Sequence, residues 1–156
     1  MIIQIDTREK QRAIRQILRE FDRRGVKHVS SKLLVGDYMS LDRPKLIIDR
    51  KQSLLELCGN VCQDLPRFRR ELALARECDI QIVILCEHGD GIRSMDDVLH
   101  WENPRLKDSP MAVSGERLWR ILTQLEKTFG VRFEFCDKRE TGRRILQILD
   151  DGAGTA

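Results

Sequence analysis

Residues 34–51 constrain the fold of this chain more than any other stretch. They contain two short apolar runs, 35–41 and 45–51, whose length and composition are typical of β-strands. A polar turn that contains Pro44 separates the two runs. The pattern therefore predicts a β-hairpin at the centre of the fold.

The second strand of this hairpin ends in charged residues, Asp49-Arg50-Lys51, and Asp37 follows Gly36 on the first. Because side chains alternate between the faces of a strand, Asp49 and Lys51 should project together, and Arg50 should point the other way. Two carboxylates on adjacent strands can hold a hard divalent cation, which activates water beside a phosphate, while a lysine steadies developing charge. The spacing leaves open a second interpretation, a salt bridge at the hairpin rim with Asp37 as a turn residue.

An earlier strand is predicted over residues 2–8, with Ile3 and Ile5 on one face. Asp6 then emerges near the end of that strand. Two hypotheses remain for it: a carboxylate of the same cleft, or a cap for the following helix. Glu9 could reach the cleft or lie in the first helical turn.

The remaining elements alternate between helix and strand. Apolar periodicity predicts helices over residues 11–24, 115–129 and 141–150, and two more that start near 53 and 65. The run 80–86 is continuously apolar, which is typical of a strand covered on both faces, and 131–136 predicts a further strand. Together these patterns predict an α/β fold with a mixed β-sheet flanked by helices.

Arginines gather at two places. The first helix carries five on its outer faces, which indicates either a solvated surface or a DNA contact: Arg12, Arg15, Arg19, Arg23 and Arg24. On the helix after residue 65, Arg67 and Arg70 lie about one turn apart, so both could reach one phosphate.

The composition narrows the class of protein. The 156 residues carry a formal net charge of +3, which permits nucleic-acid contact without requiring it. No apolar run approaches the ~20 residues that cross a bilayer, and no signal peptide is evident, so a cytoplasmic protein is expected. The five cysteines form no Cys-x-x-Cys pair, so reduced thiols are expected rather than a metal at Cys58 and Cys62. Trp101 is interpreted either as a core residue or as a stacking surface for a base.

The hairpin motifs resemble a known signature. Gly36-Asp37-Tyr38 and Asp49-Arg50-Lys51 are similar to the Gly-Asp…Glu-Arg-Lys signature of the XPF-type structure-specific nucleases. Residues 5–9 resemble the opening Val-Asp-x-Arg-Glu strand of that family, and Arg67-Phe68 with Glu71 its arginine-rich helix. The resemblance spans residues 2–88 and shows two departures. Aspartate replaces the signature glutamate at position 49, and the acid after the lysine is not aligned, Glu56 being the nearest candidate.

The resemblance implies a restriction-endonuclease-like core that hydrolyses DNA phosphodiesters with Mg²⁺ or Mn²⁺. Asp37 and Asp49 would hold the metal, and Asp6 or Glu9 would complete its outer shell. Lys51 would orient or activate the attacking water. The residues expected to grip phosphates are Arg8, Arg67, Arg70 and Arg50, although Arg50 could instead pair with a carboxylate across the sheet.

The resemblance also implies a biological setting. We expect branched, forked or flapped DNA in repair or recombination as the substrate, and a homodimer or a partner subunit as the working form. DNA affinity would depend on that assembly, because no helix-hairpin-helix module follows the nuclease motifs in these residues. We expect one nuclease domain over residues 1–150 and a frayed tail over 151–156. The main alternatives are a catalytically inactive DNA-binding or scaffold subunit, and another phosphodiesterase or resolvase on the same core.

Overall fold

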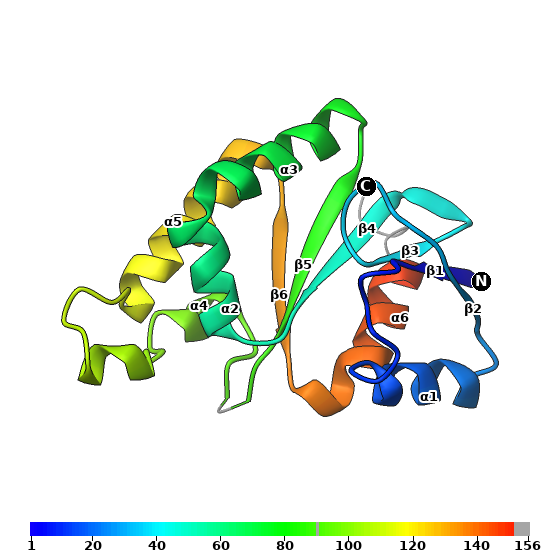
Figure 1. Cartoon of the computed structure of the whole chain (residues 1–156), viewed down its shortest axis with the longest axis horizontal. Coiled ribbons are helices and arrows are strands. Elements are labelled where there is room, and N and C mark those ends of the chain that lie inside the picture. Colours follow the sequence, from blue (N-terminus) through cyan, green and yellow to red (C-terminus); the bar gives the residue numbers. More distant parts are fainter. Residues whose placement is uncertain (90, 152–156) are drawn as a thin grey trace.

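The computed structural model describes residues 1–89 and 91–151. Its centre is a six-stranded sheet in the order β2-β1-β3-β4-β5-β6 (Figure 1). The strands are β1 (Ile2–Ile5), β2 (Lys27–Ser30), β3 (Tyr38–Ser40), β4 (Arg43–Lys51), β5 (Gln81–Glu87) and β6 (Arg132–Cys136). Of the tail expected over 151–156, Asp151 lies in the last helix and residues 152–156 lie outside the described part of the chain.

The sheet is mixed, as the sequence predicts. β3 and β4 form the expected antiparallel hairpin, and β3 also pairs antiparallel with β1. The pairs β1–β2, β4–β5 and β5–β6 are parallel. Because β4, β5 and β6 are parallel, their C-terminal ends lie on the same side of the sheet. The charged residues at the C-terminal end of β4 lie on that side.

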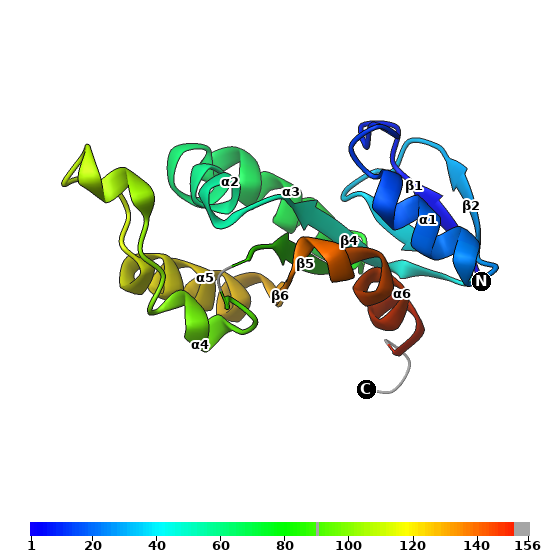
Figure 2. The same cartoon turned by 90° about the horizontal axis from the view of Figure 1, so that it is seen from below.

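Helices cover both faces of the sheet (Figures 1 and 2). One face carries α1 (Arg15–Arg23) and α6 (Thr141–Asp151), and the other carries α2 (Leu54–Cys58), α3 (Leu65–Glu77) and α5 (Gly115–Phe129). A π-helical turn, η1 (Gly59–Gln63), joins α2 to α3. The short elements are α4 (Met95–Val98), η2 (Pro104–Lys107) and η3 (Lys138–Glu140).

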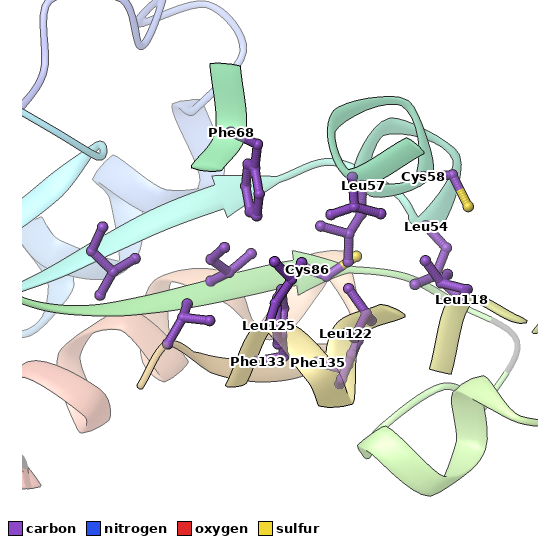
Figure 3. Packing of buried hydrophobic residues seen from close by; sticks show 14 of the residues in the cluster. Leu54, Leu57, Cys58, Phe68, Cys86, Leu118, Leu122, Leu125, Phe133 and Phe135 are labelled. Atoms are coloured by element: carbon purple, nitrogen blue, oxygen red, sulfur yellow. The ribbon is translucent and has the colours of Figure 1, made fainter. Parts of the chain in front are cut away.

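Two hydrophobic cores follow from the alternation of side chains along the strands. Ile47 of β4 packs in the core beneath α2, α3 and α5, whereas its neighbour Ile48 packs in the core beneath α1 and α6. In Figure 3, Leu57 of α2 and Leu122 of α5 lie on either side of Cys86 of β5 in the first of these cores. The sheet is therefore sandwiched, and its strands are held from both sides.

Several boundaries differ from the prediction. β1 ends at Ile5 because the chain turns there, with the Glu9 N–H donating to the Asp6 carbonyl at 3.0 Å. β3 starts only at Tyr38, because Gly36 adopts a positive φ of 70° that breaks the strand before it. The first helix begins at Arg15 rather than at residue 11.

The remaining expectations concern single residues. Trp101 is 9% exposed and belongs to the core under α5, so the core interpretation is confirmed. All five cysteines are free thiols. Within residues 1–89 and 91–151, no helix combines the length and apolarity that a membrane span requires.

Candidate active site

A polar cleft of about 300 Å³ lies at the charged end of β4. Four segments line it: the connection after β1, the loop before β3, the end of β4, and the wall formed by α2, η1 and α3. Of the predicted catalytic residues, the cleft brings together Glu9, Asp37, Asp49 and Lys51. The charged residues of the predicted hairpin, Asp37, Asp49 and Lys51, therefore line one cleft.

Backbone geometry positions Asp37. The left-handed conformation of Gly36 lets the chain pass close to β4, where a Cβ on residue 36 would collide with the side chain of Ile47. The Asp37 N–H then donates to the Ile48 carbonyl at 2.8 Å, and Asp37 Oδ2 accepts the Arg50 N–H at 2.7 Å. Only glycine fits at position 36, so this residue fixes where the carboxylate points.

Asp37 and Asp49 converge closely enough to repel each other. Burial raises the pKa of Asp37 far above its ordinary value of 3.8, and the charges of Asp49 and Glu9 raise it further. The bond from the Arg50 N–H acts in the opposite direction but does not offset these effects. A bound cation would relieve the repulsion between these two carboxylates. Their hard oxygen donors fit a divalent metal such as Mg²⁺ or Mn²⁺, because such an ion keeps several waters and needs few protein ligands.

Lys51 lies beside this pair, with Nζ 3.4 Å from Asp49 Oδ2 and a side chain only 12% exposed. Burial lowers the pKa of Lys51, but the charges of Asp49, Glu56 and Asp37 outweigh burial and raise it. The group is therefore an ammonium that donates hydrogen bonds and holds positive charge in the cleft. The salt-bridge alternative is also observed, since the pair forms an ion pair and lines the cleft.

Arg50 does not contact the cleft in the way expected of a phosphate-binding residue. Its side chain is 4% exposed, and it donates to Glu9 Oε1 at 2.6 Å, to Glu9 Oε2 at 2.9 Å and to Glu87 Oε1 at 2.8 Å. The prediction that Arg50 binds a phosphate is therefore wrong. The alternative prediction holds, since Arg50 pairs with carboxylates across the sheet. Glu9 lines the cleft, but both of its oxygens are held by Arg50.

Asp6 is placed differently from the expectation. Its side chain is fully buried; Oδ1 accepts the Leu33 N–H at 2.8 Å and Oδ2 accepts the N–H and Nε–H of Arg8. Burial raises the pKa of Asp6, but the bonds from Arg8 and Leu33 together hold it below 3.8. Asp6 therefore fastens the loop before β3, and neither a metal-ligand role nor a cap of α1 is seen. Among the residues that the structure describes, no group of three or more His, Cys, Asp or Glu side chains could hold a metal.

Of the other arginines predicted to bind phosphate, two line the cleft and one does not. Arg8 and Arg67 line the cleft with side chains 62% and 65% exposed. Arg67 makes only long ion pairs, at 3.8 Å to Asp64 and 3.7 Å to Glu71. Arg70 is exposed on the same helix but does not line the cleft. The cleft thus has two exposed cations at its rim, of which Arg8 is bonded to Asp6.

Several residues outside the predicted catalytic set also line the cleft, among them Glu56 and Asn60. Glu56 lies in the first turn of α2, which Ser53 caps, and its Oε2 accepts the Gln52 N–H at 2.7 Å. The signal for both was the step of four residues from Glu56 to Asn60 to Asp64, which all line the cleft. Glu56, the nearest candidate for the acid that the signature carries after its lysine, therefore lines the cleft.

Comparisons with known proteins agree with this architecture. The family model described as the ERCC4 domain matches residues 5–148. The solved structure of XPF from Aeropyrum pernix superimposes with a TM-score of 0.68 at 18% identity, covering 99% of this chain and 66% of that one. The same archaeal protein in complex with DNA gives 0.66 and 18%, covering 97% of this chain and 64% of that one. No curated protein sequence matches the chain.

At 18% identity, the similarity to the two archaeal structures establishes the fold of this chain. The mixed sheet flanked by helices, with the expected nuclease-like core, is therefore confirmed. The chain spans about two thirds of the length of the archaeal chains that it matches.

Proposed function

The chain belongs to the ERCC4 domain family of XPF-type, structure-specific DNA nucleases, and from its cleft we propose that it hydrolyses DNA phosphodiesters with a divalent metal ion. The observation that carries the proposal is the convergence of Asp37, Asp49 and Lys51 in one polar cleft. Carboxylate oxygens can hold a metal ion that acidifies water, and a nearby ammonium can stabilise charge that develops on a phosphate.

Each residue has a distinct role in the proposal. Asp37 and Asp49 hold Mg²⁺ or Mn²⁺, which when bound polarises a phosphate and acidifies a water molecule. The Lys51 ammonium donates to the attacking water and stabilises charge that develops on the phosphate. Arg8 and Arg67, both exposed at the rim, bind neighbouring phosphates of the strand.

The proposal extends to the substrate and to the assembly. A DNA complex of a structure with the same fold supports DNA as the ligand. We propose branched, forked or flapped DNA as the substrate, in repair or recombination. Residues 1–150 would act as one cytoplasmic nuclease domain, in a homodimer or with a partner subunit.

One observation favours the inactive-subunit alternative. The signature glutamate is replaced by the shorter Asp49, and among the described residues no group of three or more His, Cys, Asp or Glu side chains could hold a metal. Under this alternative the cleft would bind DNA without cutting it.

The test compares cleavage of labelled duplex, fork and 3′-flap DNA in Mg²⁺, Mn²⁺ or EDTA. The variants are Asp49→Asn and the control Asp108→Asn, which removes an exposed acid outside the cleft. We expect metal-dependent cleavage by the wild type and by Asp108→Asn, and at least a hundredfold loss in Asp49→Asn with folding and DNA binding retained. A folded wild type that binds these DNAs and cuts none with either metal would establish the inactive subunit instead.

A further inference from the structure

Asn60 occupies an unusual backbone element in the wall of the cleft. It lies in η1, where the Asp64 N–H donates to the Gly59 carbonyl, five residues back, at 3.0 Å. Single π-turns inside helices are rare and occur frequently at functional sites. The turn joins α2 to α3 and lies in the wall that carries Glu56.

The side-chain amide of Asn60 has no hydrogen-bond partner among the described residues, and its Oδ1 is buried. Asn103 provides the contrast within the same chain. Its Nδ2 donates to the Val113 carbonyl at 2.9 Å, and its Oδ1 accepts the Arg105 N–H at 3.0 Å. Because an unpaired buried acceptor is unfavourable, an amide left in this state on a cleft wall points to a ligand that completes its hydrogen bonds.

The charges around the cleft narrow the kind of ligand. Water molecules on a hydrated Mg²⁺ or Mn²⁺ are strong donors and need acceptors. Lys51 offers only donors, Asp37 and Asp49 are engaged with the cation itself, and Glu56 Oε2 already accepts the Gln52 N–H. A neutral amide oxygen adds an acceptor without adding to the negative charge that already crowds Asp37.

We infer that Asn60 is a positioning residue whose amide accepts a hydrogen bond from a water molecule of the hydrated cation at Asp37 and Asp49. The inference rests on the proposed function and adds a residue to it. The terminal torsion of an asparagine side chain is broad, so the amide turns toward the cleft when a donor arrives. Side chains that act through the bound waters or ligands of a metal contribute ~10-fold or more to its affinity.

The test measures Mn²⁺ binding to the metal-free protein by calorimetry, together with its melting temperature, so that no readout depends on cleavage. Asn60→Leu keeps the size of the side chain and removes the amide, Asn60→Asp keeps the acceptor, and Asn103→Leu is the matched control. We expect Asn60→Leu to bind Mn²⁺ ~10-fold more weakly and to melt no lower than the wild type. Asn60→Asp should bind at least as tightly as the wild type. Asn103→Leu should melt lower with unchanged Mn²⁺ affinity.

The outcomes separate the inference from the proposed function. Wild-type affinity within twofold in Asn60→Leu, or a lower melting temperature in that variant, would overturn the role of Asn60 and leave the metal site standing. A wild type that binds no Mn²⁺ would overturn both.

Discussion

Neighbouring side chains at the end of β4 perform opposite tasks because they leave the strand on opposite faces. Asp49 and Lys51 enter the cleft, while Arg50 passes into the protein and joins Glu9 to Glu87. Arg50 thereby ties β4 to β5 and to the connection after β1. The position of the cleft residues depends on this ion group, in which the Arg50 guanidinium is engaged with Glu9 and Glu87.

Replacing Arg50 should therefore affect stability before it affects DNA binding. Arg50→Met leaves the buried carboxylate of Glu87 and that of Glu9 without their partner, and breaking a buried ion pair on one side costs about 3–5 kcal/mol. Urea unfolding should show a loss of that order. The control Arg67→Met removes an exposed cation and should change the unfolding free energy by no more than about 0.5 kcal/mol. A fully stable Arg50→Met protein with weakened DNA binding would restore the phosphate-contact hypothesis.

The sequence could predict this site only in part. Alternation along a strand is local, so the shared side of Asp49 and Lys51 followed from their spacing. The partners of Arg50 could not be read in the same way, because Glu9 and Glu87 lie 41 and 37 residues away along the chain. Asp6 was misplaced for a related reason, since the loop N–H that binds it belongs to Leu33.

At the scale of elements, apolar periodicity predicted those strands and helices that are buried. It failed where contacts with other elements decide the structure. β2 has the sequence Lys-His-Val-Ser and a mostly exposed surface, so its pattern gives no strand signal, and its pairing with β1 makes it a strand. The π-turn η1 likewise has no pattern that distinguishes it from an ordinary helical turn.

Helix α1 and the residues beside it offer an element-scale test of the open question about the arginines of residues 12–24. Arg12, Arg15 and Arg19 are exposed and form no ion pair with any residue in the described part of the chain, whereas Arg23 and Arg24 are both bonded to Glu20. Exposed cations without an acidic partner can neutralise phosphates. We expect the triple change of Arg12, Arg15 and Arg19 to Gln to weaken duplex binding.

The measurement is DNA affinity as a function of salt concentration. Each lost phosphate contact should reduce the slope of log affinity against log salt by about 0.9, so the triple variant should lose up to about 2.7. The double change of Arg23 and Arg24 to Gln is the control and should leave the slope nearly unaltered, because these charges are already engaged with Glu20. An unchanged slope in the triple variant would identify this face as a solvated surface.

At the scale of the whole molecule, the cleft places charge where the fold is otherwise closely packed. Asp37 reaches the cleft from the loop before β3, where Gly36 lets the chain pass close to β4. The polar wall of the cleft is formed by α2, η1 and α3. The cores on both faces of the sheet hold these segments in place, so Asp37 and Asp49 cannot move apart in the folded state. Their repulsion therefore lowers the free energy of unfolding. The stability of the metal-free protein should therefore record this repulsion.

The sign of that effect follows from the raised pKa of Asp37. In the folded protein the pKa lies above the ordinary value of 3.8, because burial and then the charges of Asp49 and Glu9 disfavour the carboxylate. The folded state thus binds the proton more tightly than the unfolded state. Its contribution to stability is fully present below pH 3.8 and is lost as the pH rises through the raised pKa.

Unfolding free energies of the wild type and of Asp37→Asn, measured in EDTA between pH 5 and pH 9, isolate this contribution. We expect the wild type to lose stability relative to Asp37→Asn as the pH increases, since the amide at position 37 cannot ionise. Mn²⁺ should stabilise the wild type more at the upper end of this range, where the carboxylate that binds it is already free of its proton, and should have little effect on Asp37→Asn. A difference between the two proteins that does not change with pH would show that Asp37 is ionised throughout, and that the cleft tolerates both carboxylates without a cation.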